Sequence, residues 1–127
     1  MISFTIKQTF NCSAEIFYNT WLSSKGHTDM TGGSAEIDEK VGTEFSAWDG
    51  YISGKNLELI PQKLIKQSWR TSEFQDSDPD SLIELTLQDK ESGCVITLTH
   101  SAIPDGQPDY EQGWKDHYFT PMDAYFR

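Results

Sequence analysis

Bulky side chains, most of them aromatic, recur at a spacing of four residues near the C-terminal end of the chain. The residues that share this spacing are Tyr110, Trp114, Tyr118 and Met122. Such a spacing places side chains on one face of a helix. A face of this kind either packs into a core at normal density or forms one wall of a pocket for a small apolar molecule. The chemistry that these residues suggest is therefore hydrophobic binding.

Histidines are the side chains best suited to proton transfer and metal binding near neutral pH. His27, His100 and His117 have no second His or Cys at the spacing of a zinc site, so we predict no metal site and no cofactor. His100 continues the apolar alternation of a strand and is expected inside the protein, as a structural residue or as a polar contact for a ligand. The sequence also lacks a phosphate-binding loop, a dinucleotide-binding glycine motif and a G-x-S-x-G motif, so we predict no catalytic residue.

Acidic side chains cluster in one polar stretch of the second half of the chain. The alternation of Asp76, Asp78 and Asp80 is similar to the start of a calcium-binding loop. The pattern then fails, because Ser81 stands where such a loop has Gly and Leu87 stands where it has Glu. We favour a solvated loop, and a docking surface for a basic partner is the alternative.

The composition is typical of one soluble domain. The 127 residues are enough for one hydrophobic core, and we expect a single domain over residues 1–127. Twenty acidic against ten basic residues give a formal net charge of −10, which argues against nucleic-acid binding and against an anionic membrane surface. No apolar run approaches the roughly 20 residues that span a bilayer, and the N-terminus lacks the pattern of a signal peptide. We therefore expect a cytoplasmic protein.

The N-terminal part of the chain has the pattern of a strand followed by a helix. Apolar and polar residues alternate over residues 2–7, as in a strand with one buried face. Ser13 or Asn11 can cap the helix that follows. We expect this helix, or a short continuation of it, to end at Gly26, and residues 28–34 to form a connection.

The rest of the chain has the pattern of several strands followed by a helix. Residues 35–103 are expected to form about six strands joined by turns, of which Asp49-Gly50 is typical of a tight type I′ hairpin. Asp109 can cap the final helix, which we expect Pro121 to kink or break. The element order predicts an α+β fold, in which a curved antiparallel sheet of about six to seven strands packs around the C-terminal helix, the helix-grip architecture.

Short motifs along the chain add a family resemblance to this fold prediction. They are Val41-Gly42 before Phe45, Asp49-Gly50, Gly54, Leu57-Glu58-Leu59 before Pro61, Trp69-Arg70, Thr97 to Ser101, and Gly113-Trp114. In this order they resemble the family of homologues of the C-terminal domain of the heat-shock protein 90 ATPase activator. That family belongs to the START-like or SRPBCC superfamily. The resemblance implies the helix-grip fold and a scaffold reused for ligand binding, co-chaperone contact and, in distant relatives, catalysis.

The strand alternation and the helical stripe place a set of side chains between the sheet and the terminal helix. They are Phe45, Leu57, Trp69, Leu85 and Trp114, with His100 and Tyr118 as polar contacts. We therefore hypothesise a non-enzymatic domain that binds a small hydrophobic or amphipathic ligand in this space. One alternative is a co-chaperone-type module that acts on a heat-shock protein 90 chaperone. A third interpretation is an enzyme that uses the cavity as its active site, with His100 as its candidate group.

Overall fold

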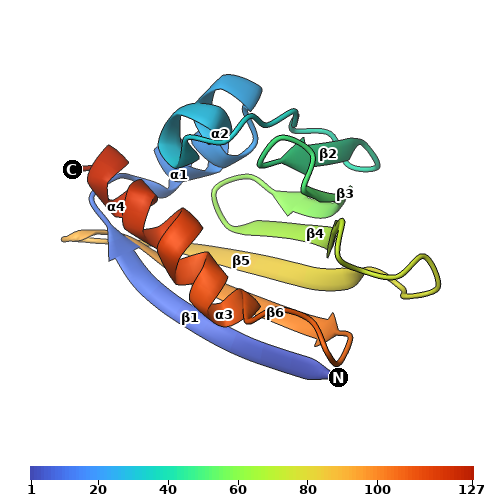
Figure 1. Ribbon diagram of the computed structural model, residues 1–127. Helices are drawn as coiled ribbons and strands as arrows, with labels where there is room; N and C mark the ends of the chain where they lie inside the picture. The colour runs from blue at the N-terminus through green and yellow to red at the C-terminus, as the bar shows by residue number, and fades with distance from the viewer.

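The computed structural model describes residues 1–127 and contains one sheet of six strands in the order β1-β6-β5-β4-β3-β2. The strands are β1 (Ile2–Phe10), β2 (Glu44–Ala47), β3 (Ile52–Ile60), β4 (Leu64–Thr71), β5 (Ser81–Lys90) and β6 (Gly93–Ile103). All neighbouring strands are antiparallel. The sheet curves around a C-terminal helix (Figure 1), so the α+β helix-grip prediction is confirmed.

Helical segments from both ends of the chain cover the same face of the sheet (Figure 1). They are α1 (Ala14–Trp21), α2 (Ser24–Thr31) and a C-terminal helix composed of α3 (Tyr110–Trp114), the π-helical turn η1 (Lys115–Phe119) and α4 (Thr120–Tyr125). The C-terminal helix runs along the concave face, and α1 and α2 lie near its α4 end. None of these helices is long and apolar enough to cross a membrane.

The region between β1 and β2 contains two helices. Ser13 caps α1 as predicted, since its Oγ accepts a hydrogen bond from Ile16 N–H at 3.1 Å. Ser23 caps α2 in the same way through Gly26 N–H at 3.1 Å, so the prediction that a helix ends at Gly26 is wrong. A Cβ on Gly26 would lie 2.8 Å from the carbonyl oxygen of Thr20. Glycine therefore allows α2 to fold back against the end of α1.

The C-terminal helix stays continuous at the proline where the sequence predicted a kink or a break. Thr120 N–H bonds to the carbonyl oxygen of Lys115, five residues earlier, which is the wider bonding pattern of a π-helical turn. Pro121 follows this turn in the first turn of α4, where a proline is tolerated. The extra residue of the π turn also directs both Tyr118 and Phe119 toward the interior, and both are buried.

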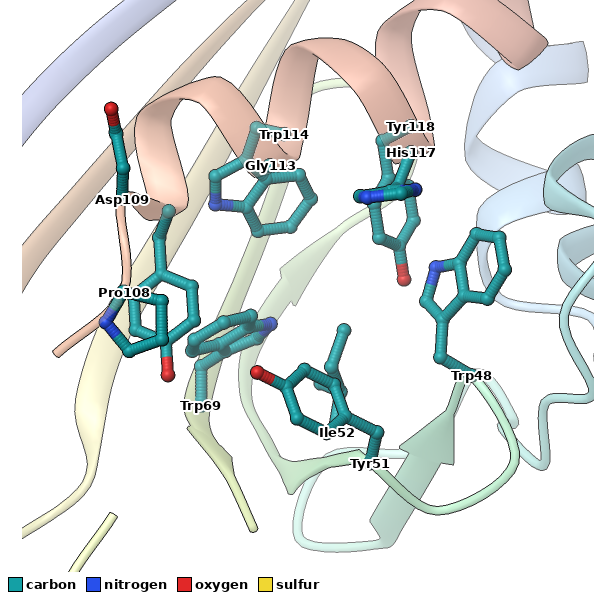
Figure 2. A pocket seen from close by; sticks show the side chains of 11 residues that line it. Trp48, Tyr51, Ile52, Trp69, Pro108, Asp109, Gly113, Trp114, His117 and Tyr118 are labelled. Carbon is teal, nitrogen blue, oxygen red and sulfur yellow. The ribbon is translucent and has the colours of Figure 1, made fainter. Parts of the chain in front are cut away.

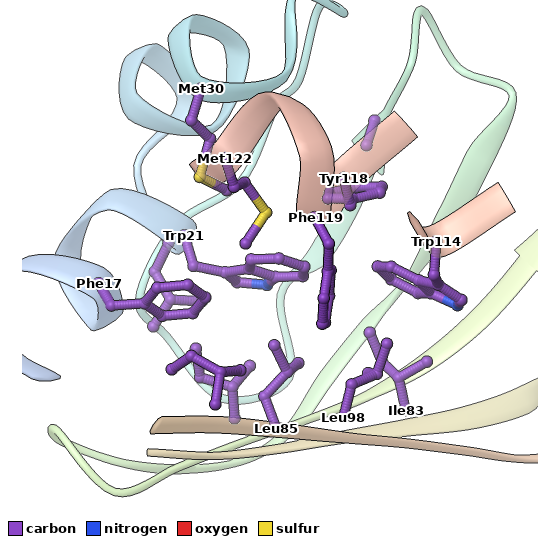
Figure 3. Packing of buried hydrophobic residues seen from close by; sticks show 14 of the residues in the cluster. Phe17, Trp21, Met30, Ile83, Leu85, Leu98, Trp114, Tyr118, Phe119 and Met122 are labelled. Carbon is purple, nitrogen blue, oxygen red and sulfur yellow. The ribbon is translucent and has the colours of Figure 1, made fainter. Parts of the chain in front are cut away.

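A continuous core of apolar side chains fills most of the space between the sheet and the helices (Figure 3). Trp21 of α1, Leu98 of β6 and Phe119 of η1 are almost completely buried in it. Phe45 and Leu85 also belong to this core, in agreement with their predicted inward direction. The space beneath the C-terminal helix is therefore largely packed by protein.

Leu57 differs from its prediction, because its side chain is 39% exposed on the outer side of β3. The pairing of β3 with β4 shifts by one residue between Asn56 and Glu58, which identifies a β-bulge at Leu57. A bulge interrupts the strict alternation of a strand. Asn56 therefore takes the inward position, where its side chain is buried and bonded to Gln67 at 2.8 Å.

Candidate functional site

A pocket of about 490 Å³ lies between the first half of the C-terminal helix and strands β2 to β4 (Figure 2). Aromatic rings form most of its walls. The lining residues are Trp48, Tyr51, Ile52, Trp69, Pro108, Asp109, Tyr110, Gly113, Trp114, His117 and Tyr118. The volume falls within the roughly 300–1,000 Å³ that is typical of pockets for small molecules.

The start of the C-terminal helix is fixed at one end of the pocket. Asp109 caps α3 as predicted, with its Oδ1 accepting from Gln112 N–H at 3.1 Å. The Tyr110 hydroxyl donates to Gln107 Oε1 at 2.8 Å and lies 2.7 Å from Thr71 Oγ1 at the end of β4. These bonds anchor the helix to the strand that forms the opposite wall.

A chain of buried hydrogen bonds holds the two central tryptophans. Trp114 Nε1–H donates to His100 Nδ1 at 3.0 Å, so the other ring nitrogen of His100 carries the proton and bonds Ser81 Oγ at 2.9 Å. The Ser81 hydroxyl donates in turn to the Trp69 carbonyl at 2.6 Å. Burial lowers the pKa of His100 from its usual 6.5 to about 3, so the imidazole is neutral. His100 therefore positions the walls and does not itself line the pocket.

A second buried histidine holds Tyr118. His27 of α2 donates from Nδ1 to the Trp21 carbonyl at 2.9 Å, and its Nε2 accepts from the Tyr118 hydroxyl at 2.9 Å. Burial lowers the pKa of His27 to about 4 and raises the pKa of Tyr118. The Tyr118 ring lines the pocket, but its hydroxyl is engaged with the protein. Tyr118 was predicted to offer its hydroxyl to a ligand, but this hydroxyl is bonded to His27 instead.

Replacing Tyr118 with Phe is expected to lower the free energy of unfolding by about 1–3 kcal/mol, because it leaves the buried Nε2 of His27 without a donor. Urea unfolding followed by circular dichroism measures this loss. Tyr125→Phe is the matched control, since Tyr125 is 47% exposed and its change should stay within about 0.5 kcal/mol. Equal effects of the two substitutions would contradict the assigned hydrogen bond.

The turn between β2 and β3 brings an unpredicted tryptophan to the pocket. Trp48, Asp49 and Gly50 all have positive φ, at 51°, 59° and 89°. Tyr51 N–H bonds to the Trp48 carbonyl at 3.1 Å, so Asp49 and Gly50 are the central residues of one tight turn. Gly50 N–H also bonds to the Ala47 carbonyl at 3.2 Å, which adds an overlapping turn centred on Trp48 and Asp49. The predicted tight turn at Asp49-Gly50 is confirmed, and the overlapping turn makes the whole connection four residues long between the paired Ala47 and Ile52. Trp48 is the first residue of this connection, and its ring points toward the C-terminal helix (Figure 2).

The structure brings only part of the predicted residue set to the pocket. Trp69, Trp114 and Tyr118 line it. Phe45, Leu85 and His100 are buried beside it in the core, and Leu57 lies on the opposite side of the sheet. The pocket therefore lies toward one edge of the sheet rather than along the whole length of the helix.

Sequence reasoning missed the rim of the pocket, which Trp48, Tyr51 and His117 form. Two of them flank the Asp49-Gly50 motif, and aromatic residues on both sides of a predicted tight turn are a usable signal. His117 immediately precedes Tyr118, and the π-helical turn rotates both toward the same opening.

The acidic stretch after β4 is organised around one arginine. Arg70 donates to the carbonyl oxygens of Gln75 and Asp78 at 2.9 and 3.0 Å, and to Asp80 Oδ1 at 2.8 Å. The guanidinium also lies 5.3 Å from the centre of the Phe74 ring. The loop therefore folds back on the sheet, with Asp78 half-buried and Glu73 and Asp76 exposed.

Comparison with known proteins relates nearly the whole chain to one protein family. The model of the family "Activator of Hsp90 ATPase homolog 1-like protein" matches residues 11–127. The chain is 28% identical over 96% of its length to the human activator of 90 kDa heat shock protein ATPase homolog 1, but it spans only 36% of that relative.

Among solved structures, an HSP90 activator from Plasmodium falciparum is similar in fold, with a TM-score of 0.87 at 24% identity over 98% of this chain and 96% of that one. The Aha1 dimer from Colwellia psychrerythraea is also similar in fold, with a TM-score of 0.78 at 16% identity. It covers 99% of this chain and 94% of its own.

Proposed function

The chain belongs to the family of activator of Hsp90 ATPase homolog 1-like proteins, and on this premise we propose that it is a non-enzymatic domain that holds a small hydrophobic or amphipathic molecule in the aromatic pocket. One observation carries the proposal. Rings from the β2–β3 turn, from β4 and from the C-terminal helix converge on one open space of ligand size.

The construction of the pocket supports binding rather than catalysis. Its central rings are held by buried bonds to His100 and His27, so the walls are formed before any ligand arrives. A preformed site loses less conformational entropy on binding. Both ring nitrogens of His100 are bonded within the protein, which removes the candidate for acid–base chemistry, and we assign no catalytic residue.

Native mass spectrometry of the purified protein tests this function. We expect an adduct of a few hundred daltons, on the order of a ligand that fits such a pocket, which is lost on denaturation. Gly113→Leu is expected to abolish the adduct, because Gly113 lines the pocket and a Cβ there meets no protein atom within 4 Å. The Leu side chain would therefore occupy ligand space without displacing the core.

Gly113→Ala is the matched control and is expected to retain the adduct, since it adds one methyl group at the same position. An adduct that survives Gly113→Leu lies outside the pocket and would contradict the proposal. A bare mass for the folded protein would favour the second candidate below.

The second candidate is a co-chaperone-type module that acts on a heat-shock protein 90 chaperone. Its support is the family itself and the human relative, which is an activator of a heat shock protein ATPase, although the chain spans about a third of that relative. The net charge of −10 suits a basic partner surface, and we place both candidate functions in the cytoplasm. A pull-down with a purified heat-shock protein 90 at micromolar concentration tests it, and failure to retain the chaperone at low salt would contradict it.

A further inference from the structure

Trp48 carries a hydrogen-bond donor that the protein leaves unpaired. Its indole Nε1 is buried and has no partner within the chain. A buried N–H without an acceptor is costly, and such groups are rare in folded proteins. Figure 2 shows this nitrogen on the pocket side of the ring, facing the side chains of the C-terminal helix.

The surrounding structure holds the Trp48 ring in this position against a backbone preference. A φ of 51° is disfavoured for a bulky residue. Two bonds clamp the turn, from Asp49 N–H to the Ser34 carbonyl at 3.0 Å and from Ser34 N–H to Asp49 Oδ1 at 3.1 Å. The ring packs directly against Gly33, where a Cβ would lie 2.5 Å from Trp48 Cε3, so only glycine leaves room for it. The indole is therefore fixed before a ligand binds.

The other polar groups deep in the pocket are already engaged with the protein. The Tyr118 hydroxyl bonds His27, the Trp114 indole bonds His100 and the Tyr110 hydroxyl bonds Gln107. Trp69, on the wall opposite Trp48, also has its indole nitrogen on the pocket side (Figure 2). The pocket thus presents indole donors to a ligand, with the His117 imidazole at the rim, while its hydroxyl groups are occupied.

We propose that Trp48 Nε1–H recognises a hydrogen-bond acceptor on the ligand, and that the ligand is a flat, uncharged molecule with a carbonyl or ether oxygen on an apolar body. This inference rests on the proposed ligand-binding function. Aromatic walls suit a flat apolar body, and a buried donor selects an acceptor because an unpaired donor is penalised. The strongly negative net charge, with Asp109 at the pocket, disfavours an anionic ligand.

A matched pair of probes tests the proposal. The flat ketone 9-fluorenone carries one acceptor, and fluorene has CH₂ in its place. Titrations of the full chain are followed by ¹H–¹⁵N spectra of the four indole groups, with Trp48→Phe identifying the Trp48 signal. We expect 9-fluorenone to move the Trp48 Nε1–H signal downfield and fluorene to leave it near its free position.

The variant adds an affinity measurement. Trp48→Phe keeps an aromatic ring but removes the N–H, so it should weaken 9-fluorenone about tenfold relative to fluorene. Equal effects on both probes, together with an unmoved Trp48 signal, would overturn the acceptor inference and leave an apolar pocket. Binding of neither probe to the folded protein would overturn the proposed function and this inference with it. If Trp48→Phe does not fold, nuclear Overhauser contacts to the neighbouring His117 and Tyr118 rings assign the wild-type Trp48 signal, which then decides alone.

Discussion

Lowering the pH from 7 to about 4 is expected to cost the protein about 6 kcal/mol of its free energy of unfolding. His27 and His100 are almost completely buried, and neither ring contacts a carboxylate. Burial lowers their pKa values from 6.5 to about 4 and about 3. The unfolded chain therefore binds two protons as the pH falls below about 6.5, whereas the folded chain binds them only near its lowered pKa values. Each of the two histidines contributes about 3 kcal/mol to the loss of stability by pH 4.

The sign of this effect follows from the lowered pKa values. Stability is complete above the unfolded value of 6.5 and falls as the pH drops toward the folded values. Since typical domains have about 5–15 kcal/mol of stability, a loss of this size should bring the protein close to unfolding at pH 4 without denaturant. Urea midpoints measured between pH 7 and 4 check the prediction.

His117→Gln serves as the control for the acid transition, because this histidine is exposed in the folded protein. The pH dependence of the urea midpoint should remain that of the wild type. A flat profile in the wild type would mean that the two buried imidazoles accept protons in the folded state, which the bonds that His100 and His27 accept from Trp114 and Tyr118 oppose.

Gly54→Ala is expected to destabilise the protein by about 3 kcal/mol and to lower its Tm by roughly 10 °C. A Cβ on Gly54 would lie 1.8 Å from the carbonyl oxygen of Ser68 and 2.7 Å from Cε1 of Phe45. The first of these atoms belongs to the backbone of the neighbouring strand β4 and cannot move without breaking the pairing of the sheet. Thermal unfolding followed by circular dichroism measures the effect.

The same substitution at Gly113 is expected to have the opposite sign. Gly113 lies inside α3 with open space around a Cβ, so Gly113→Ala should stabilise the helix by up to about 1 kcal/mol. Similar Tm values for Gly54→Ala and the wild type would show that β3 and β4 are farther apart than in this structure.

Local spacing in the sequence determined the fold class and the family. Strand alternation, the Ser13 cap and the four-residue aromatic stripe depend on residues that are close in the chain. Their geometry follows from the period of a strand or a helix, so pattern alone predicts them. Trp69, Trp114 and Tyr118 were identified as pocket residues for the same reason.

The tertiary structure decided which of the inward residues meet around an open space. The bulge at Leu57 depends on how β3 and β4 pair, and one residue of shift reverses the side that a strand residue faces. The position of the Trp48 ring depends on the bonds between Asp49 and Ser34, which join the turn to a distant part of the chain. The bond from Tyr118 to His27 joins positions 91 residues apart. No local pattern encodes such a contact, because it forms only when the curved sheet brings α2 and the C-terminal helix together.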